Sequence, residues 1–168
     1  MPSSVRSGVG RSESELIARW PAVRPFLVVG SVCIVAGGVV AAVTRPTGFE
    51  LGSWLAAYLV LVGGVAQIGL GTGQAWLAQA PPRWEEVRTE VVAWNLSVVA
   101  TVVGTLLAAP IVTTVGGIAL VVALGRFLVG VRTTGAGSRL VRVAYRGLTA
   151  IVLVSTPVGL VLAWIRHG

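Results

Sequence analysis

Hydrophobic residues occur along this chain in long segments that are separated by short polar ones. Five segments are close to the roughly 20 apolar residues that a helix needs to cross a hydrocarbon layer about 30 Å thick. They cover residues 26–43, 54–78, 91–109, 113–131 and 147–165. The pattern therefore predicts an all-α integral membrane protein, a bundle of five transmembrane helices.

The third and fourth segments come from dividing one long apolar run, residues 91–131. This run has 41 residues, and at about 1.5 Å per residue it is twice as long as one crossing requires. Pro110 disfavours helical geometry at Ala109 and is followed by Ile111, Val112, Thr113 and Thr114, so the division is expected as a tight hairpin near these residues. In the last segment, Pro157 predicts a kink.

The distribution of arginine predicts the orientation, because positively charged loops stay on the cytoplasmic side. With five crossings, ten of the 13 arginines lie on the side of the N-terminus. We therefore expect residues 1–25 to form a cytoplasmic leader, residues 26–165 the transmembrane domain and residues 166–168 an external tail. Within the leader, Ser12 and Glu15 resemble a capping box, which predicts a short interfacial helix before Pro21.

Composition supports the membrane assignment. Hydrophobic residues make up 55% of the chain and charged residues 11%, with a mean hydropathy of +0.87, which excludes an ordinary water-soluble domain. All basic residues are Arg and all acidic residues are Glu, a usage that indicates a GC-rich, bacterial coding sequence and hence the cell membrane. The net charge is +7, and the arginines that cause it lie beside the apolar segments. This position favours anionic lipid headgroups as partners and argues against nucleic acid.

Small residues recur on one face of each segment, as close helix packing in lipid requires. The second segment is the most unusual, with five glycines between Gly63 and Gly73 and with Gln67 and Gln74 on one side. Lipid would be a poor neighbour for these groups, so the segment is expected at the bundle centre. Comparable stripes on other segments comprise Gly30, Cys33, Gly37 and Ala41; Ser97, Thr101, Thr105 and Ala109; and Gly116, Ala119, Ala123 and Gly130.

Several polar residues of different segments share one depth on the cytoplasmic side. The predicted hairpin brings Arg126 to the level of the residues around Val98. The candidate polar pocket comprises Gln67, Gln74, Trp94, Asn95 and Arg126. Two explanations apply: Arg126 snorkels to the interface or makes a structural hydrogen bond, which is the favoured one, or the residues form a pocket for an anionic ligand or headgroup.

A second arginine group precedes the last segment. Ser138 could cap a helix that places Arg139, Arg142 and Arg146 on one side. This pattern is typical of a face for anionic lipid, although retention of the loop on the cytoplasmic side explains the same arginines and is favoured.

The usual catalytic groups are scarce. The chain has no Asp, its one histidine is His167, and no Glu falls within the predicted segments. We therefore expect no enzyme, no metal site and no cofactor. The preferred function is a non-catalytic structural, assembly or accessory subunit, as a homo-oligomer or in a larger membrane complex. The alternative is a small transporter or channel that uses the face of Gln67 and Gln74 with Asn95 and Arg126.

Overall fold

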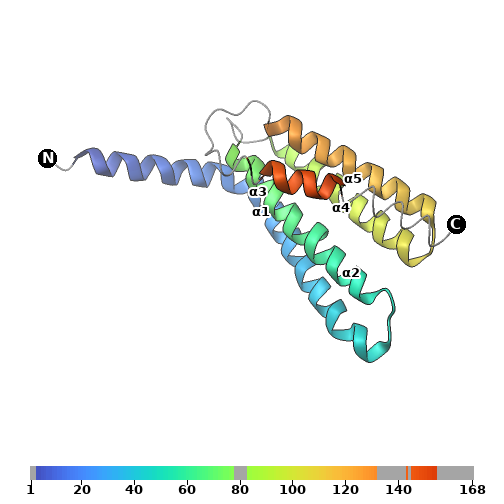
Figure 1. Cartoon of the computed structure of the whole chain (residues 1–168). Coiled ribbons are helices and arrows are strands. Elements are labelled where there is room, and N and C mark those ends of the chain that lie inside the picture. Colours follow the sequence, from blue (N-terminus) through green and yellow to red (C-terminus); the bar gives the residue numbers. More distant parts are fainter. Residues whose placement is uncertain (1–2, 78–82, 132–142, 144, 155–168) are drawn as a thin grey trace.

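The computed structural model is all-helical and describes residues 3–77, 83–131, 143 and 145–154 (Figure 1). The labelled elements are α1 (Ser3–Thr47), α2 (Gly52–Tyr58), η1 (Leu59–Ala66), α3 (Gln67–Leu77), α4 (Trp84–Leu106) and α5 (Pro110–Val131). A further helix covers Tyr145–Val154. Here α2, η1 and α3 follow one another without a break, and η1 is a π-helix, a form whose hydrogen bonds reach five residues along the chain.

Four segments are long and apolar enough to cross a membrane: Ile17–Thr47, Gly52–Ala75, Trp84–Leu106 and Pro110–Phe127. They contain the first four predicted segments almost completely, so the protein is a multi-pass, all-α membrane protein. Of the fifth predicted segment, residues 147–154 belong to the Tyr145–Val154 helix, whereas residues 155–165, with Pro157, lie outside the described residues. The fifth crossing and the orientation stay predictions.

The N-terminal helix differs from the expected leader. α1 runs without interruption through Pro21 and Pro25, and its first turns extend beyond the rest of the bundle (Figure 1), so no separate interfacial helix ends before Pro21. Each proline removes one N–H and leaves one helical carbonyl without its usual donor. Packing of the inward face of α1, where Ala22, Val23 and Phe26 are buried, offsets the loss of these hydrogen bonds.

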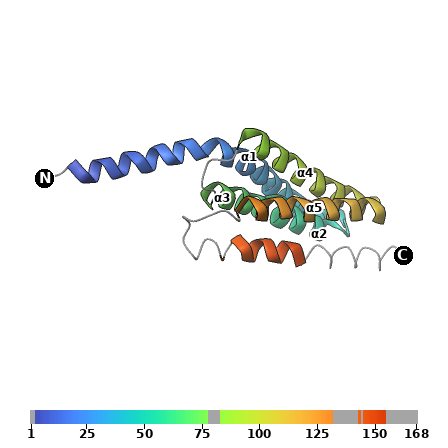
Figure 2. The same cartoon turned by 90° about the horizontal axis from the view of Figure 1, so that it is seen from above.

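The helices form two antiparallel hairpins, one of α1 with α2–η1–α3 and one of α4 with α5. The hairpins meet beside α3 and diverge toward their turns (Figures 1 and 2). The Tyr145–Val154 helix lies against α3, where Leu148 meets Gly69 and Tyr145 meets Gly73. The second apolar segment thus contacts α1, α4, α5 and this last helix, which agrees with the central position expected for it.

Close backbone approach holds each hairpin together, as the small-residue stripes predict. A Cβ added at Gly37 would lie 2.9 Å from the carbonyl oxygen of Ala56, and one added at Gly116 would lie 2.7 Å from the amide nitrogen of Thr101. Neither distance is compatible with a side chain. The stripe on α1 ends before Ala41, which is exposed.

The two turns adopt left-handed backbone conformations. Gly48, after α1, has a φ of 65°, and Ala108, after α4, has a φ of 49°. Because Pro110 is the first residue of α5, the second turn lies at residues 107–109, slightly before the predicted one. Proline suits this position because the first N–H groups of a helix have no intrahelical partner.

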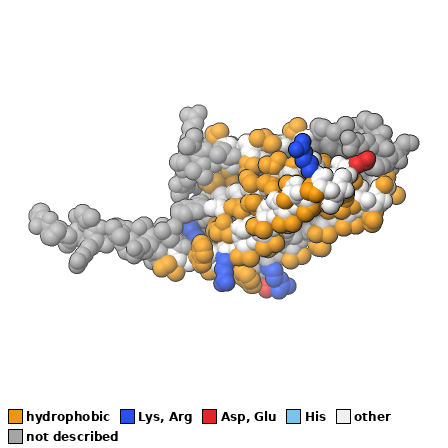
Figure 3. Space-filling model, turned by 90° about the horizontal axis from the view of Figure 1, so that it is seen from below, with side chains coloured by type: hydrophobic (Ala, Val, Ile, Leu, Met, Phe, Trp, Pro, Cys, Tyr) orange, Lys and Arg blue, Asp and Glu red, His pale blue; other side chains and the backbone are white. Residues whose placement is uncertain are grey.

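The outward faces of the helices are apolar. Figure 3 shows hydrophobic side chains over most of one such face, with only a few charged ones. Exposed valines and leucines follow α1 and α4, for example Val28 and Val35 on α1 and Leu96 and Val103 on α4. This surface is the one expected to meet lipid.

Candidate buried polar site

A hydrogen bond between two buried polar side chains joins the two hairpins. The Nε2 of Gln74, near the end of α3, donates to Oε1 of Glu90 in α4 over 3.1 Å. Gln74 is 6% exposed and Glu90 is 7% exposed. The other carboxylate oxygen of Glu90, Oε2, and the Oε1 of Gln74 are buried and have no hydrogen-bond partner among the described residues. Two of the four side-chain polar atoms of this pair therefore make no hydrogen bond among the described residues.

Two further buried polar groups lie on the same helix faces. Gln67 is seven residues before Gln74, two turns of α3, and Trp94 is four residues after Glu90, one turn of α4. Both side chains are 0% exposed. Neither amide atom of Gln67 has a hydrogen-bond partner in the described part of the chain, and the same holds for Nε1 of Trp94. We refer to Gln67, Gln74, Glu90 and Trp94 as the buried polar cluster.

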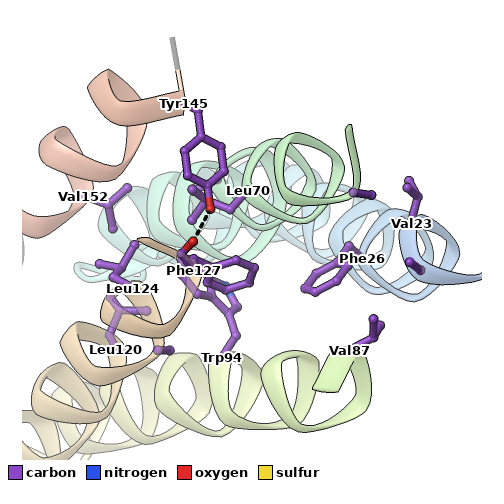
Figure 4. Packing of buried hydrophobic residues seen from close by; sticks show 14 of the residues in the cluster. Val23, Phe26, Leu70, Val87, Trp94, Leu120, Leu124, Phe127, Tyr145 and Val152 are labelled. Carbon is purple, nitrogen blue, oxygen red and sulfur yellow. Dashed lines mark hydrogen bonds between the residues drawn. The ribbon is translucent and has the colours of Figure 1, made fainter. Parts of the chain in front are cut away.

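Trp94 belongs to a core of apolar side chains from α1, α3, α4, α5 and the Tyr145–Val154 helix (Figure 4). The rings of Trp94 and Phe127 meet edge to face with centroids 5.9 Å apart, and Phe26 meets Phe127 in the same way at 5.8 Å. The hydroxyl of Tyr145 donates to the backbone oxygen of Phe127 over 3.1 Å. Because such surroundings screen charges weakly, electrostatic interactions inside the cluster are stronger than in water.

Two arginines lie near the cluster. Arg126 of α5 interacts electrostatically with Glu90, but its side chain is exposed. Arg19 of α1 donates to the backbone oxygen of Ala75, where carbonyl groups at the end of α3 lack intrahelical partners. Among the described residues, the hydrogen-bond partner of the Glu90 carboxylate is a neutral amide, Gln74.

Of the five residues of the predicted polar pocket, Gln67, Gln74 and Trp94 are buried. Their convergence in one pocket stays a prediction. Asn95 is directed elsewhere, since its Nδ2 donates to the backbone oxygen of Val91 in its own helix over 2.8 Å. Arg126 lies at the edge and is exposed.

Glu90 is the residue that sequence reasoning missed. The predicted segments leave out every glutamate, whereas Glu90 lies in α4, within the candidate span Trp84–Leu106, and is buried in the bundle. Hydropathy placed the start of the span at Val91, immediately after the charged residues. The helical period carried the missing signal, because Glu90, Trp94 and Ser97 share one face, and all three are buried.

The second arginine group is described only in part. Arg139 and Arg142 lie outside the described residues, and Arg146 is exposed on the Tyr145–Val154 helix. The anionic-lipid face therefore stays a prediction.

Comparison with known proteins gives no identification. No protein-family model, no curated protein and no solved structure matches this chain. Its function has to be argued from the site itself.

The chemistry available at the cluster is that of binding. Within the described ranges, no group of three or more His, Cys, Asp or Glu side chains is placed to hold a metal ion. Buried polar atoms without hydrogen bonds each cost about 1–3 kcal/mol. A solute or water that makes those hydrogen bonds recovers this cost, so the cluster is suited to hold a small polar molecule.

Proposed function

We propose that this protein is a non-catalytic, multi-pass membrane protein that binds a small polar solute inside its helix bundle, as a small transporter or solute-binding protein does. The observation that carries the proposal is Gln67, which is completely buried while neither atom of its amide has a hydrogen-bond partner among the described residues. Polar and ionisable residues inside membrane-spanning helices are costly and usually serve function.

Structural packing alone does not require these polar groups. The close contacts at Gly37 and Gly116 join each hairpin through backbone and small side chains. At position 67 a leucine, similar in size to glutamine, would fill the same space without burying an unpaired amide. The unpaired amide of Gln67 thus adds a cost that packing at this position does not require.

A structural or accessory role is the second candidate, and the outer face of α1 favours it. A row of exposed valines follows this face: Val28, Val32, Val35, Val39 and Val43. In lipid such a row lies against acyl chains, and it can equally pack against an apolar helix of a partner or of a second copy. In that role the chain would act through helix packing in a homo-oligomer or a larger membrane complex.

A single substitution tests the proposal, Gln67→Leu in protein reconstituted in lipid nanodiscs. Removing the unpaired amide should raise stability by about 1–3 kcal/mol, while stabilisation by added polar solutes should be lost. Thermal unfolding is measured with acetamide, glycerol, methylammonium chloride and sodium acetate. Asn95→Leu is the matched control, because the Asn95 amide bonds within its own helix and its loss should leave the solute response intact.

Two results would contradict solute binding. One is a wild-type protein that no solute of the panel stabilises; the other is a response that survives Gln67→Leu. If, in addition, a stoichiometric protein partner co-purifies in mild detergent and dissociates when Val35 is replaced by Trp, the accessory role is the better explanation.

A further inference from the structure

The unpaired atoms of the buried polar cluster have an uneven hydrogen-bonding character. Three are acceptors: Oε1 of Gln67, Oε1 of Gln74 and Oε2 of Glu90. Two are donors, Nε2 of Gln67 and Nε1 of Trp94. The Gln74 amide is held in one orientation, because its Nε2 donates to Glu90. The two side-chain atoms of Gln74 and Glu90 that make no hydrogen bond among the described residues are thus both acceptors.

The charge at the cluster has the same preference. Glu90 is buried among apolar side chains, and its hydrogen-bond partner among the described residues is a neutral amide. Arg126, which acts on Glu90 electrostatically, is exposed. A carboxylate in weakly screening surroundings repels an anion and attracts a cation. Glu90 therefore favours a cationic ligand, whereas Arg126 alone would favour an anionic one.

Among cations, one that carries N–H donors fits better than a metal ion. Calcium takes six to eight oxygen ligands and magnesium keeps several waters in an octahedral shell. The pair of Gln74 and Glu90 supplies two unused oxygens, and the surrounding residues Phe26, Leu70 and Phe127 are apolar. A small ammonium group satisfies such acceptors with its own hydrogen atoms, through charge-assisted hydrogen bonds.

From these observations we infer that the buried polar cluster binds a small primary ammonium compound, whose charged group contacts Glu90 and Gln74. The amide of Gln67 and the indole nitrogen of Trp94 then form hydrogen bonds with the rest of the ligand. This inference rests on the proposed function and specifies its ligand class.

The experiment is a thermal-unfolding titration of the full chain in nanodiscs at constant pH and ionic strength. Methylammonium chloride is the probe, tetramethylammonium chloride has the charge without N–H donors, and sodium chloride is the reference. We expect methylammonium at about 100 times its dissociation constant to raise the unfolding temperature by about 5 °C or more. Tetramethylammonium should have no effect beyond that of sodium.

Two matched variants locate the effect. In Glu90→Gln the shape of the side chain is retained and the charge removed, so the methylammonium response should disappear while the protein stays folded. Glu85→Gln changes an exposed glutamate in the first turn of the same helix, and its response should equal that of the wild type. Helical circular dichroism confirms that both variants fold.

The outcomes separate this inference from the function on which it rests. Stabilisation by acetamide that Gln67→Leu abolishes and Glu90→Gln preserves would overturn the ammonium ligand and keep solute binding. If lower pH stabilised the protein and methylammonium did not, Glu90 would bind a proton and not an ammonium group, which would overturn the inference. An equal response to tetramethylammonium would overturn the role of the N–H donors. Absence of any solute response would contradict both proposals.

Discussion

The two ends of the helix bundle are packed with different kinds of side chain. At the end where α3 finishes and α4 begins, large rings fill the interior, with Phe26, Trp94 and Phe127 almost completely buried. At the end that carries the two turns, Gly37 and Gly104 bring helix backbones into direct contact. There the hairpins diverge (Figure 1), and large apolar side chains such as Leu107 are exposed.

This difference separates two tasks. Backbone contact through glycine joins helices within lipid, where burial of apolar surface gives no driving force. The end with the aromatic residues also contains Gln74 and Glu90, whose hydrogen bond joins the hairpins and which each keep one oxygen without a hydrogen-bond partner among the described residues. A rigid interior around them keeps their geometry fixed, which is what a binding site requires. The end with the turns therefore serves assembly, and under the proposed function the aromatic end combines assembly with binding.

The largest expected effect comes from removing a ring at the aromatic end. Phe127→Ala should cost about 3–5 kcal/mol, because Phe127 is 0% exposed and contacts both Phe26 and Trp94. Leu106→Ala, at the end with the turns, is the control. Leu106 is exposed, so its truncation should cost less than about 1 kcal/mol. Equilibrium unfolding in detergent measures both, and equal losses would contradict the comparison.

A smaller effect is expected where glycine brings helices together. In Gly116→Ala the new Cβ would press against the backbone nitrogen of Thr101, at 2.7 Å, and such overpacking costs about 1–3 kcal/mol. Gly125→Ala in the same helix meets nothing within 4 Å and should gain up to about 1 kcal/mol from helix propensity. If both variants behaved alike in the same unfolding assay, close approach would not be what holds α4 to α5.

Sequence reasoning succeeded where hydrophobicity and residue size determine the structure. The first four apolar segments, the central place of the second one and the small-residue contacts follow from local composition. Gln67, Gln74 and Trp94 are buried, and the pocket that the sequence predicts from their depth along the helices stays a prediction. These properties depend on residue type and spacing, which the sequence shows directly.

Other features depend on contacts between segments and could not be predicted in the same way. Glu90 is charged, so hydropathy assigned it to water, whereas Gln74 of another helix holds it inside. α1 passes Pro21 and Pro25 because neighbouring helices bury its inward face. The π-helix Leu59–Ala66 lies where Gly63 and Gly64 approach α1, and nothing in its residue types separates it from an α-helix.

The smallest expected effect concerns the turns that close the two hairpins. Both contain a left-handed residue, but Gly48 adopts this conformation freely, whereas Ala108, with a φ of 49°, has a Cβ that crowds its own backbone. Ala108→Gly should relieve this strain and gain up to about 1 kcal/mol, less the added freedom of glycine in the unfolded chain. Gly48→Ala should lose a similar amount. Thermal unfolding in nanodiscs measures both changes, which should have opposite signs because the same backbone geometry is required at both turns. Destabilisation by both substitutions would mean that the Ala108 side chain supplies packing that outweighs its strain.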